Sequence, residues 1–382
     1  MTHEDRDGLD DLGAWLRLLA TPGVGRGTAR VLLARFGPPQ QVFSQSLAAL
    51  RGAVGDALAQ ALHTEPETWR SDVATVRAWL DADASRHVLT LDDARFPRKL
   101  LDTADPPLLL YAQGRLEWLD APSIAIVGSR HPTPQGRDNA RAFARALGNG
   151  GWTIVSGLAM GIDGAAHEGA LESLGSTIAV VGTGLDRIYP ARHEKLARRI
   201  AEHGLMLSEL PLGSAPLAEN FPQRNRIIAG LAQGTLVVEA AVQSGSLITA
   251  RMANECGREV FAIPGSIHSP LSRGCHALIK QGAKLVEDAQ DVLDELRGGA
   301  SARASRADAD GATTRDEPAS PALASRDRAI VDAMGFDPVD FDTILDRTGL
   351  DTATAQARLL DLELEGHIQR IPGGRFQRRA RG

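Results

Sequence analysis

The sequence predicts an α/β protein built on a doubly wound, mainly parallel sheet. Between Pro122 and Leu296, short apolar runs alternate with amphipathic stretches such as Gly136–Leu147 and Ser246–Glu255. The apolar runs are continuous, which indicates strands that are buried on both faces and covered by helices. The candidate strands are Ile124–Val127, Thr153–Val155, Thr177–Val181, Met206–Ser208, Leu236–Val238, Val260–Ile263 and Lys284–Val286.

Flanking segments extend this central region, because 382 residues exceed the size of one ordinary domain. Residues 1–110 are predicted to form a helical domain, and residues 111–297 contain the α/β pattern. Residues 298–327 are rich in alanine, serine, glycine and balanced charge. Such a segment buries too little apolar surface to offset its ordering entropy, so we expect a flexible linker. Residues 328–377 form a compact C-terminal domain.

Composition limits the class of protein. Hydrophobic residues at 43% and charged residues at 24% are typical of a soluble globular chain. Apolar runs are too short for a membrane span, and the acidic N-terminus does not resemble a secretion signal. The two cysteines, Cys256 and Cys275, provide neither a disulfide framework nor a thiolate zinc site, so we expect a cytoplasmic protein. A net charge of −6 requires any nucleic-acid site to gather its cations in one place.

Small residues follow the predicted strands at one edge of the sheet. Glycine and hydroxyl residues there allow a phosphate to approach backbone N–H groups, and helix N-termini add a favourable dipole. Arg130, Arg224 and Arg226 bring cations to the same loops. The pattern predicts an extended phosphate-binding edge. Its loops are Gly128–Arg130, Ser156–Asp163, Gly182–Asp186, Phe221–Gly230, Ser244–Ala250 and Pro264–Ser266.

No catalytic residue, metal or cofactor is expected. The chain lacks G-x-G-x-x-G after the first strand and lacks GxxxxGK[ST], which disfavours dinucleotide and P-loop sites. Asp163, Glu209 and Glu239 have no acid–base partner that the sequence fixes, and Asp163 is interpreted as a loop-orienting or capping residue. The histidines show no metal-ligand spacing. They are His167, His193, His268 and His276.

Six segments of the α/β region carry a resemblance to a known family. They are IAIVGSR, IVSGLAMGIDGAAH, VGTGLD with Tyr189-Pro190, FPQRNRIIAGL, VVEAAVQSGSLITARMANECGREVFAIPG and RGCHALIKQGA. In this order they resemble the signature blocks of the DNA-processing protein A family (DprA, also called Smf). The resemblance covers about residues 122–287, and its most specific part is FPQRNRIIAGL followed by SGSLITA.

This resemblance implies an extended Rossmann-like domain that holds single-stranded DNA along its strand-end pocket. It also implies a homodimer that loads the recombinase RecA onto incoming strands during natural transformation. Arg226 joins the implied contacts as a further cation of the α/β pocket. The positions carried over by motif are Gly128, Ser129, Arg130, Ser156, Gly157, Phe221, Arg224, Asn225 and Lys280.

Two of these positions have an alternative interpretation. Phe221 is predicted to stack on a base, which is tolerant of sequence, or to act as a hydrophobic staple ahead of a helix that starts at Pro222. Lys280 either contacts the strand or complements the dipole at a helix end.

The N-terminal region contains a helix-hairpin-helix pattern over Leu18–Leu33, with a Pro22–Gly25 turn. Exposed N–H groups in such a turn suit a DNA phosphate, and the alternative is a hairpin kept for packing. In the family that the chain resembles, this region is a SAM-like helical domain.

The C-terminal domain is predicted to be a winged helix, with helices at Arg328–Ala333, Asp340–Thr348 and Thr352–Glu365 and a wing at Ile368–Phe376. The third helix is acidic and contains a single cation, Arg358, which favours protein contact over DNA contact. The arginines that remain for weak nonspecific attraction are Arg370, Arg375, Arg378, Arg379 and Arg381.

The leading hypothesis is therefore a DNA-binding mediator and not an enzyme. One alternative is a nucleotide hydrolase of the lysine-decarboxylase-like group, whose signature is PGGxGTxxE. Here Pro264-Gly265 is followed by Ser266-Ile267-His268, without the acidic element. Another alternative is a small-nucleotide sensor that uses the same pocket.

Overall fold

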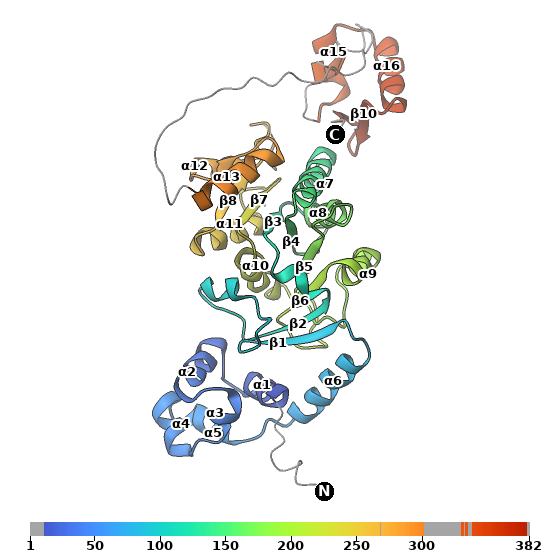
Figure 1. Ribbon diagram of the computed structural model, residues 1–382. Helices are drawn as coiled ribbons and strands as arrows, with labels where there is room; N and C mark the ends of the chain where they lie inside the picture. Colours follow the sequence, from blue (N-terminus) through green and yellow to red (C-terminus); the bar gives the residue numbers. More distant parts are fainter. Residues whose placement is uncertain (1–10, 268, 302–329, 332, 335–337, 380–382) are drawn as a thin grey trace.

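The computed structural model describes residues 11–267, 269–301, 330–331, 333–334 and 338–379 (Figure 1). Of the predicted linker, residues 298–301 belong to the end of helix α13 (Ala289–Ser301), and residues 302–327 lie outside the described part. His268, Arg381 and residues 328, 329 and 332 of the first predicted winged-helix helix also lie outside it.

Six helices form the N-terminal part of the chain, around a core that includes Trp15, Leu18 and Leu32. The predicted hairpin is present as α1, a turn and α2. Gly23 in this turn has φ +81°, which favours glycine, and a Cβ there would meet the Leu58 side chain at 2.8 Å. The helices are α1 (Asp11–Ala20), α2 (Arg26–Phe36), α3 (Pro39–Phe43), α4 (Leu47–Val54), α5 (Asp56–His63) and α6 (Trp69–Asp81).

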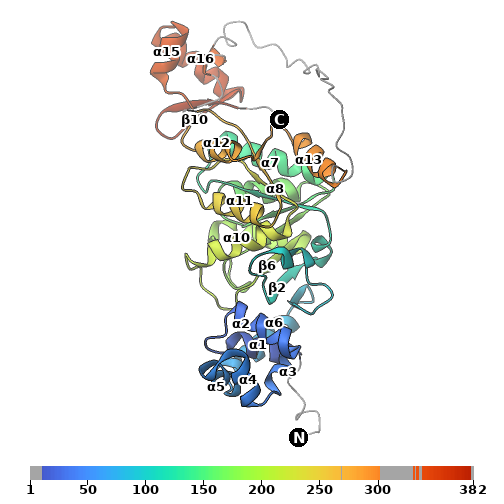
Figure 2. The ribbon, with the colours of Figure 1, turned by 90° about the vertical axis from the view of Figure 1, so that its left-hand side faces the viewer.

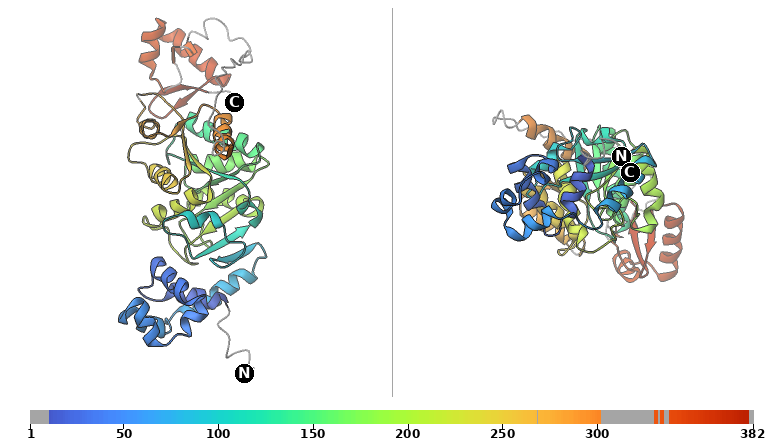
Figure 3. Two further views of the ribbon diagram at one scale, coloured as in Figure 1. Left: turned by 60° about the vertical axis from the view of Figure 1, so that its left-hand side comes forward. Right: turned by 90° about the horizontal axis from the view of Figure 1, so that it is seen from below.

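The prediction that residues 1–110 are helical is wrong after α6. Strand β1 (Arg86–Thr90) and the 3₁₀ helix η2 (Arg98–Asp102) follow, and β1 pairs antiparallel with β2 (Leu109–Gly114). β1 is a half-buried strand at the edge of the sheet, so it has no continuous apolar run. The N-terminal helices lie beside this edge (Figures 1 and 3).

The nine-stranded sheet has the order β1-β2-β6-β5-β4-β3-β7-β8-β9. Strands β3 to β9 are parallel to one another, which confirms the predicted mainly parallel sheet and each of its seven predicted strands. The added strand β2 pairs antiparallel with β6. The parallel strands are β3 (Ser123–Val127), β4 (Thr153–Ser156), β5 (Thr177–Val180), β6 (Leu205–Ser208), β7 (Gly234–Val237), β8 (Glu259–Ala262) and β9 (Lys284–Leu285).

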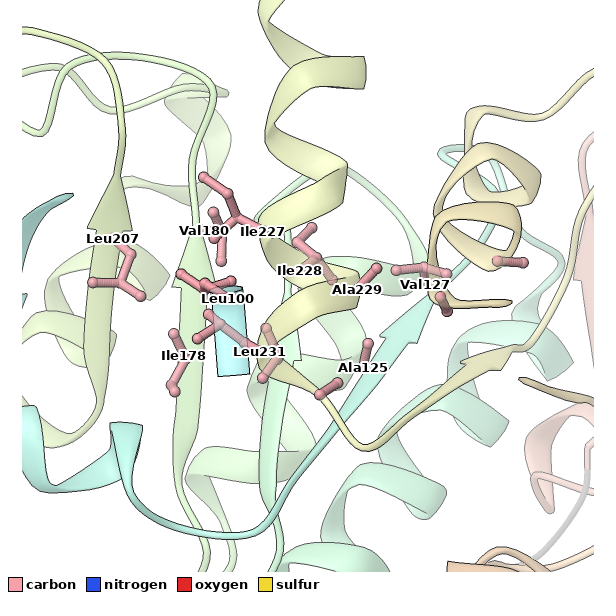
Figure 4. Packing of buried hydrophobic residues seen from close by; sticks show 14 of the residues in the cluster. Leu100, Ala125, Val127, Ile178, Val180, Leu207, Ile227, Ile228, Ala229 and Leu231 are labelled. Carbon is pink, nitrogen blue, oxygen red and sulfur yellow. The ribbon is translucent and has the colours of Figure 1, made fainter. Parts of the chain in front are cut away.

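Helices cover both faces of this sheet (Figure 2). Alternate residues of one strand point to opposite faces, so Ile124 packs with α7 and α8, whereas Val127 packs with α10. Figure 4 shows Ile227 and Leu231 of α10 against the strands. The two layers are α7 (Pro134–Asn149), α8 (Ile162–Leu171), α9 (Glu194–His203) and α13 on one face, and α10 (Asn220–Leu231), α11 (Gly245–Glu255) and α12 (Arg273–Lys280) on the other.

The C-terminal domain has the predicted winged-helix elements within its described residues. Residues 330–331 and 333–334 are helical, and α15 (Phe341–Thr348) and α16 (Thr352–Leu364) follow. Asp340 and Asp351 cap these two helices by accepting hydrogen bonds from backbone N–H groups. The wing is the antiparallel pair β10 (Ile368–Ile371) and β11 (Arg375–Arg378).

Candidate nucleic-acid interface

A cleft of about 690 Å³ lies where the winding of the sheet reverses. From β3 the chain builds β4, β5 and β6 on one side, and it returns to place β7 on the other side of β3. Loops after β3 and β7 therefore diverge, and the ligands of such sheets bind between them. Gly128 and Ser129 line the cleft from one side, and Ser244 and Gly245 line it from the other.

The loop after β3 is held against the end of β7. Ser129 N–H donates to the Glu239 carbonyl at 2.7 Å, and a Cβ at Gly128 would meet that carbonyl oxygen at 2.9 Å. The Glu239 carboxylate accepts hydrogen bonds from Thr133 N–H at 2.9 Å and from Thr133 Oγ1 at 2.6 Å. Burial raises the pKa of Glu239, although these two hydrogen bonds oppose the rise. Glu239 thus positions the start of α7.

The side chain of Asp163 holds the loop after β4 through two hydrogen bonds. Its buried carboxylate accepts hydrogen bonds from Gly157 N–H at 3.1 Å and Ala159 N–H at 3.3 Å. This confirms the interpretation of Asp163 as a loop-orienting residue. Burial raises the pKa of Asp163, and the charge of Arg224 acts in the opposite direction.

Two histidines hold Leu158, which has the left-handed φ of +57°. Leu158 N–H donates to His167 Nε2 at 3.2 Å, and His193 Nδ1 donates to the Leu158 carbonyl at 3.0 Å. Burial lowers the pKa of His167 to about 3, so its ring is neutral, and Nδ1–H donates to Thr177 Oγ1 at 2.8 Å. These contacts assign a structural role to both histidines.

Helix α10 supplies one wall of the cleft through Phe221, Arg224, Asn225 and Ile228. These positions recur at helical spacing and so share one face. Arg224 is mostly buried: its Nη1 donates to the carbonyls of Gly157 at 2.5 Å and Val180 at 2.6 Å. Burial lowers the pKa of Arg224 to about 10, so the guanidinium stays charged at neutral pH.

Phe221 is the centre of a small aromatic and cationic group at the cleft. The Arg130 guanidinium lies 5.3 Å from the centroid of its ring, and the Tyr189 ring lies 5.8 Å away. Because α10 starts at Asn220, Phe221 lies within its first turn. The alternative of a staple ahead of a helix starting at Pro222 is therefore wrong.

Three of the predicted site residues line neither this cleft nor the smaller hollow beside it. Ser156 is buried, and its Oγ donates to the Ile126 carbonyl at 2.6 Å. Arg226 lies two positions after Arg224, which places it on another face of α10, where it pairs with Glu209. Lys280 is exposed at the last residue of α12, which fits the helix-dipole alternative.

The other predicted residues are brought together as expected. Gly128, Ser129, Arg130, Phe221, Arg224 and Asn225 line the cleft, and Gly157 borders the adjoining hollow next to Phe221. Tyr189 and Ser244 were absent from the predicted set. Ser244 stands in a loop that the sequence had already singled out, and its Oγ accepts a hydrogen bond from Ser246 N–H at the start of α11. The place of Tyr189 depends on how the β5–α9 connection folds back, which no local pattern predicts.

Within the described part of the chain, no three His, Cys, Asp or Glu side chains are grouped so that they could hold a metal ion. Among the described helices, none is both long and apolar enough to cross a membrane.

The fold and the cleft define a multidomain Rossmann-like protein with a candidate binding cleft at the reversal point of its sheet. The profile of the family described as DNA recombination-mediator protein A matches residues 87–297, and that of the DprA winged helix domain matches residues 314–374. Protein Smf of Escherichia coli is 42% identical over 306 residues, which span 80% of each chain. The chain belongs to the DprA/Smf family.

Two solved structures are similar to this one. DNA processing protein A from Streptococcus pneumoniae aligns with a TM-score of 0.62 and 40% identity, covering 74% of this chain and 97% of the other. The protein from Helicobacter pylori aligns with a TM-score of 0.51 and 32% identity, covering 56% and 96%. The work on the second concerns the single-stranded DNA binding mode of that protein.

Proposed function

We propose that this protein binds single-stranded DNA in the cleft, independently of sequence, and acts as a mediator of DNA processing and recombination without being an enzyme. The observation that carries the proposal is the arrangement of Arg130 over Phe221 at the mouth of a cleft lined by the first turns of two helices. It combines a cation, helix-terminal N–H groups and an aromatic ring.

The chemistry of the walls favours an unpaired strand. Loops of small residues let a phosphate approach backbone N–H groups, and the guanidinium of Arg130 neutralises it. Phe221, Tyr189 and Ile248 offer apolar surface to the faces of bases. Base faces are available in a single strand and are stacked within a duplex, so the walls suit the former. Stacking requires no particular base, which supports sequence independence.

The carboxylates near the cleft are already engaged in structure. Asp163 accepts two backbone N–H groups, and Glu239 accepts both hydrogen bonds of Thr133. This supports a binding role over nucleotide hydrolysis.

The resemblance to the family adds further expectations. We propose a homodimer that acts in the cytoplasm, with single-stranded DNA and RecA as its partners, and that protects incoming strands and loads RecA onto them during natural transformation. The similarity to relatives named as DNA processing proteins supports the broader role.

A titration with fluorescent oligonucleotides tests this proposal. We expect the protein to bind oligothymidylate several bases long and to bind mononucleotides only weakly. Arg130→Ala should weaken binding, and Arg198→Ala on the exposed face of α9 is the matched control. Tight binding of mononucleotides, or their hydrolysis, would favour the nucleotide sensor or the hydrolase instead. A gel shift of the bound strand with RecA present then tests the loading role.

A further inference from the structure

Helix α10 presents a second face that has no part in the cleft. Arg226 and Gly230 are four residues apart, so they lie together on this face. A Cβ at Gly230 would meet Thr103 Cγ2 at 2.5 Å and Leu100 Cδ2 at 3.0 Å. Helix η2 and the residue after it, Thr103, therefore pack directly on the helix that carries Phe221 and Arg224.

Arg226 forms a buried ion pair on this face. Its Nη2 contacts Glu209 Oε2, and the two side chains are only 9% and 15% exposed. Arg226 Nε and Nη1 have no hydrogen-bond partner within the described residues, so Glu209, bound through Nη2, provides the main neutralising charge. Glu209 follows β6, so the pair joins α10 to a loop at the edge of the parallel strands.

The ion pair continues into the N-terminal helices. Arg26 Nη1 lies 3.5 Å from Glu209 Oε2, and Arg26 Nε lies 2.5 Å from Asp105 Oδ2. Arg30, one turn further along α2, pairs with Asp105 at 2.7 Å and donates to the Pro106 carbonyl at 3.1 Å. Arg26, Arg30, Asp105, Glu209 and Arg226 thus form an unbroken charged chain from α2 to α10, which we call the α2–α10 clamp.

We propose that Arg226 and Glu209 are positioning residues for strand binding, and that the α2–α10 clamp couples docking of the N-terminal helices to the cleft. One rigid helix carries the clamp on one face and the cleft wall on the other, so a shift of α10 moves both. This coupling is reciprocal. Docking of the N-terminal helices favours binding of single-stranded DNA, and bound single-stranded DNA favours their docking by the same factor. The inference rests on the proposed binding of single-stranded DNA.

Two sets of variants test the clamp in the full chain. Glu209→Gln with Arg226→Gln removes both buried charges together and so leaves neither unpaired. Arg26→Ala with Arg30→Ala cuts the outer link at side chains that are 30% exposed, away from the core of the sheet. A charge swap, Glu209→Arg with Arg226→Glu, asks whether the pair itself matters. Arg70→Ala, which removes the exposed ion pair between α6 and Glu65, is the control.

Three measurements are made on each protein: the melting temperature, the affinity for oligothymidylate, and the rate of limited proteolysis between α6 and β2. We expect the inner double variant to bind the strand about five- to tenfold more weakly, with partial rescue by the charge swap. The outer double variant should be cleaved faster, and oligothymidylate should slow the cleavage of the wild type but not of this variant.

The outcomes separate the two proposals. If wild type fails to bind oligothymidylate, the proposed function falls and the positioning role falls with it. If wild type binds and both double variants, melting like wild type, bind equally well, only the positioning role is overturned. If the inner double variant unfolds, the outer double variant tests the coupling. Unchanged affinity for oligothymidylate, together with an unchanged slowing of proteolysis by oligothymidylate, would contradict the coupling.

Discussion

The cleft lies where doubly wound sheets commonly bind ligands, and the winged helix is a fold that commonly contacts DNA, yet the side chains of the two places differ. The cleft gathers Arg130, Phe221 and two helix N-termini around one hollow. The third helix of the winged helix, α16, exposes Leu360 (55%) and Leu364 (78%), with Asp361 beside them. A fold therefore supplies a location, whereas the side chains at that location decide what binds there.

Removal of both the Arg130 and the Phe221 side chains should have the largest effect on the binding of single-stranded DNA. We expect Arg130→Ala with Phe221→Ala to cost about 1–3 kcal/mol of strand-binding free energy for the lost stacking, with more from the lost charge. Fluorescence anisotropy over a range of salt should show a log–log slope smaller by about 0.7, for one phosphate contact. An unchanged slope would mean that Arg130 contacts no phosphate.

A smaller change tests whether Arg224 acts as an internal brace. A Cβ at Gly157 would collide with Arg224 Nη1, so Gly157→Ala should displace the guanidinium from the two carbonyls. We expect a loss of about 1.5–3 kcal/mol in unfolding free energy, together with weaker strand binding. Gly27→Ala on α2, where a Cβ meets nothing within 4 Å, is the control in chemical denaturation. Equal stability of the two variants would contradict the bracing role.

The pH dependence of stability tests the loop behind the cleft. The pKa of His167 is lowered to about 3 in the folded protein, whereas it is near 6.5 when unfolded. The unfolded chain therefore binds a proton first, so stability is complete above about pH 6.5 and falls as the pH drops toward 3. At pH 5 the loss is about 2 kcal/mol.

Thermal melts between about pH 7.5 and pH 5 measure this effect, because this range spans the pKa of an unperturbed histidine. His167→Gln should melt at a lower temperature but show a flatter dependence on pH. The exposed His63→Gln should keep the slope of the wild type. A slope that survives in His167→Gln would assign the pH dependence to other groups.

The winged helix should show the smallest effects. Its wing cation Arg370 lies over the Phe376 ring at 5.0 Å, and α16 contains only one cation, Arg358. We expect Arg370→Ala and Leu360→Glu to change the affinity for oligothymidylate by less than about twofold, since scattered exposed charges contribute weakly. A tenfold loss in either variant would place a second strand-binding surface in this domain and erase the contrast.

Sequence patterns predicted the location of the cleft because parallel strands end at a common edge, which fixed Gly128 and Ser129 near α10. They did not separate Arg224 from Arg226. Side chains two positions apart on a helix point to nearly opposite sides. The position of α10 in the fold was therefore needed to decide which of the two arginines faces the cleft. Strand β1 was missed because an edge strand needs no continuous apolar run, and Lys280 lies outside the cleft because it is the last residue of α12.

The brace formed by Arg224 has a kinetic consequence. It joins the ends of two neighbouring strands through their carbonyls, so the protein itself holds this wall of the cleft in place. If the cleft binds a polynucleotide as proposed, we expect capture to involve little rearrangement of the protein and the encounter of the two charged molecules to limit its speed. The association rate constant should therefore fall steeply as ionic strength rises.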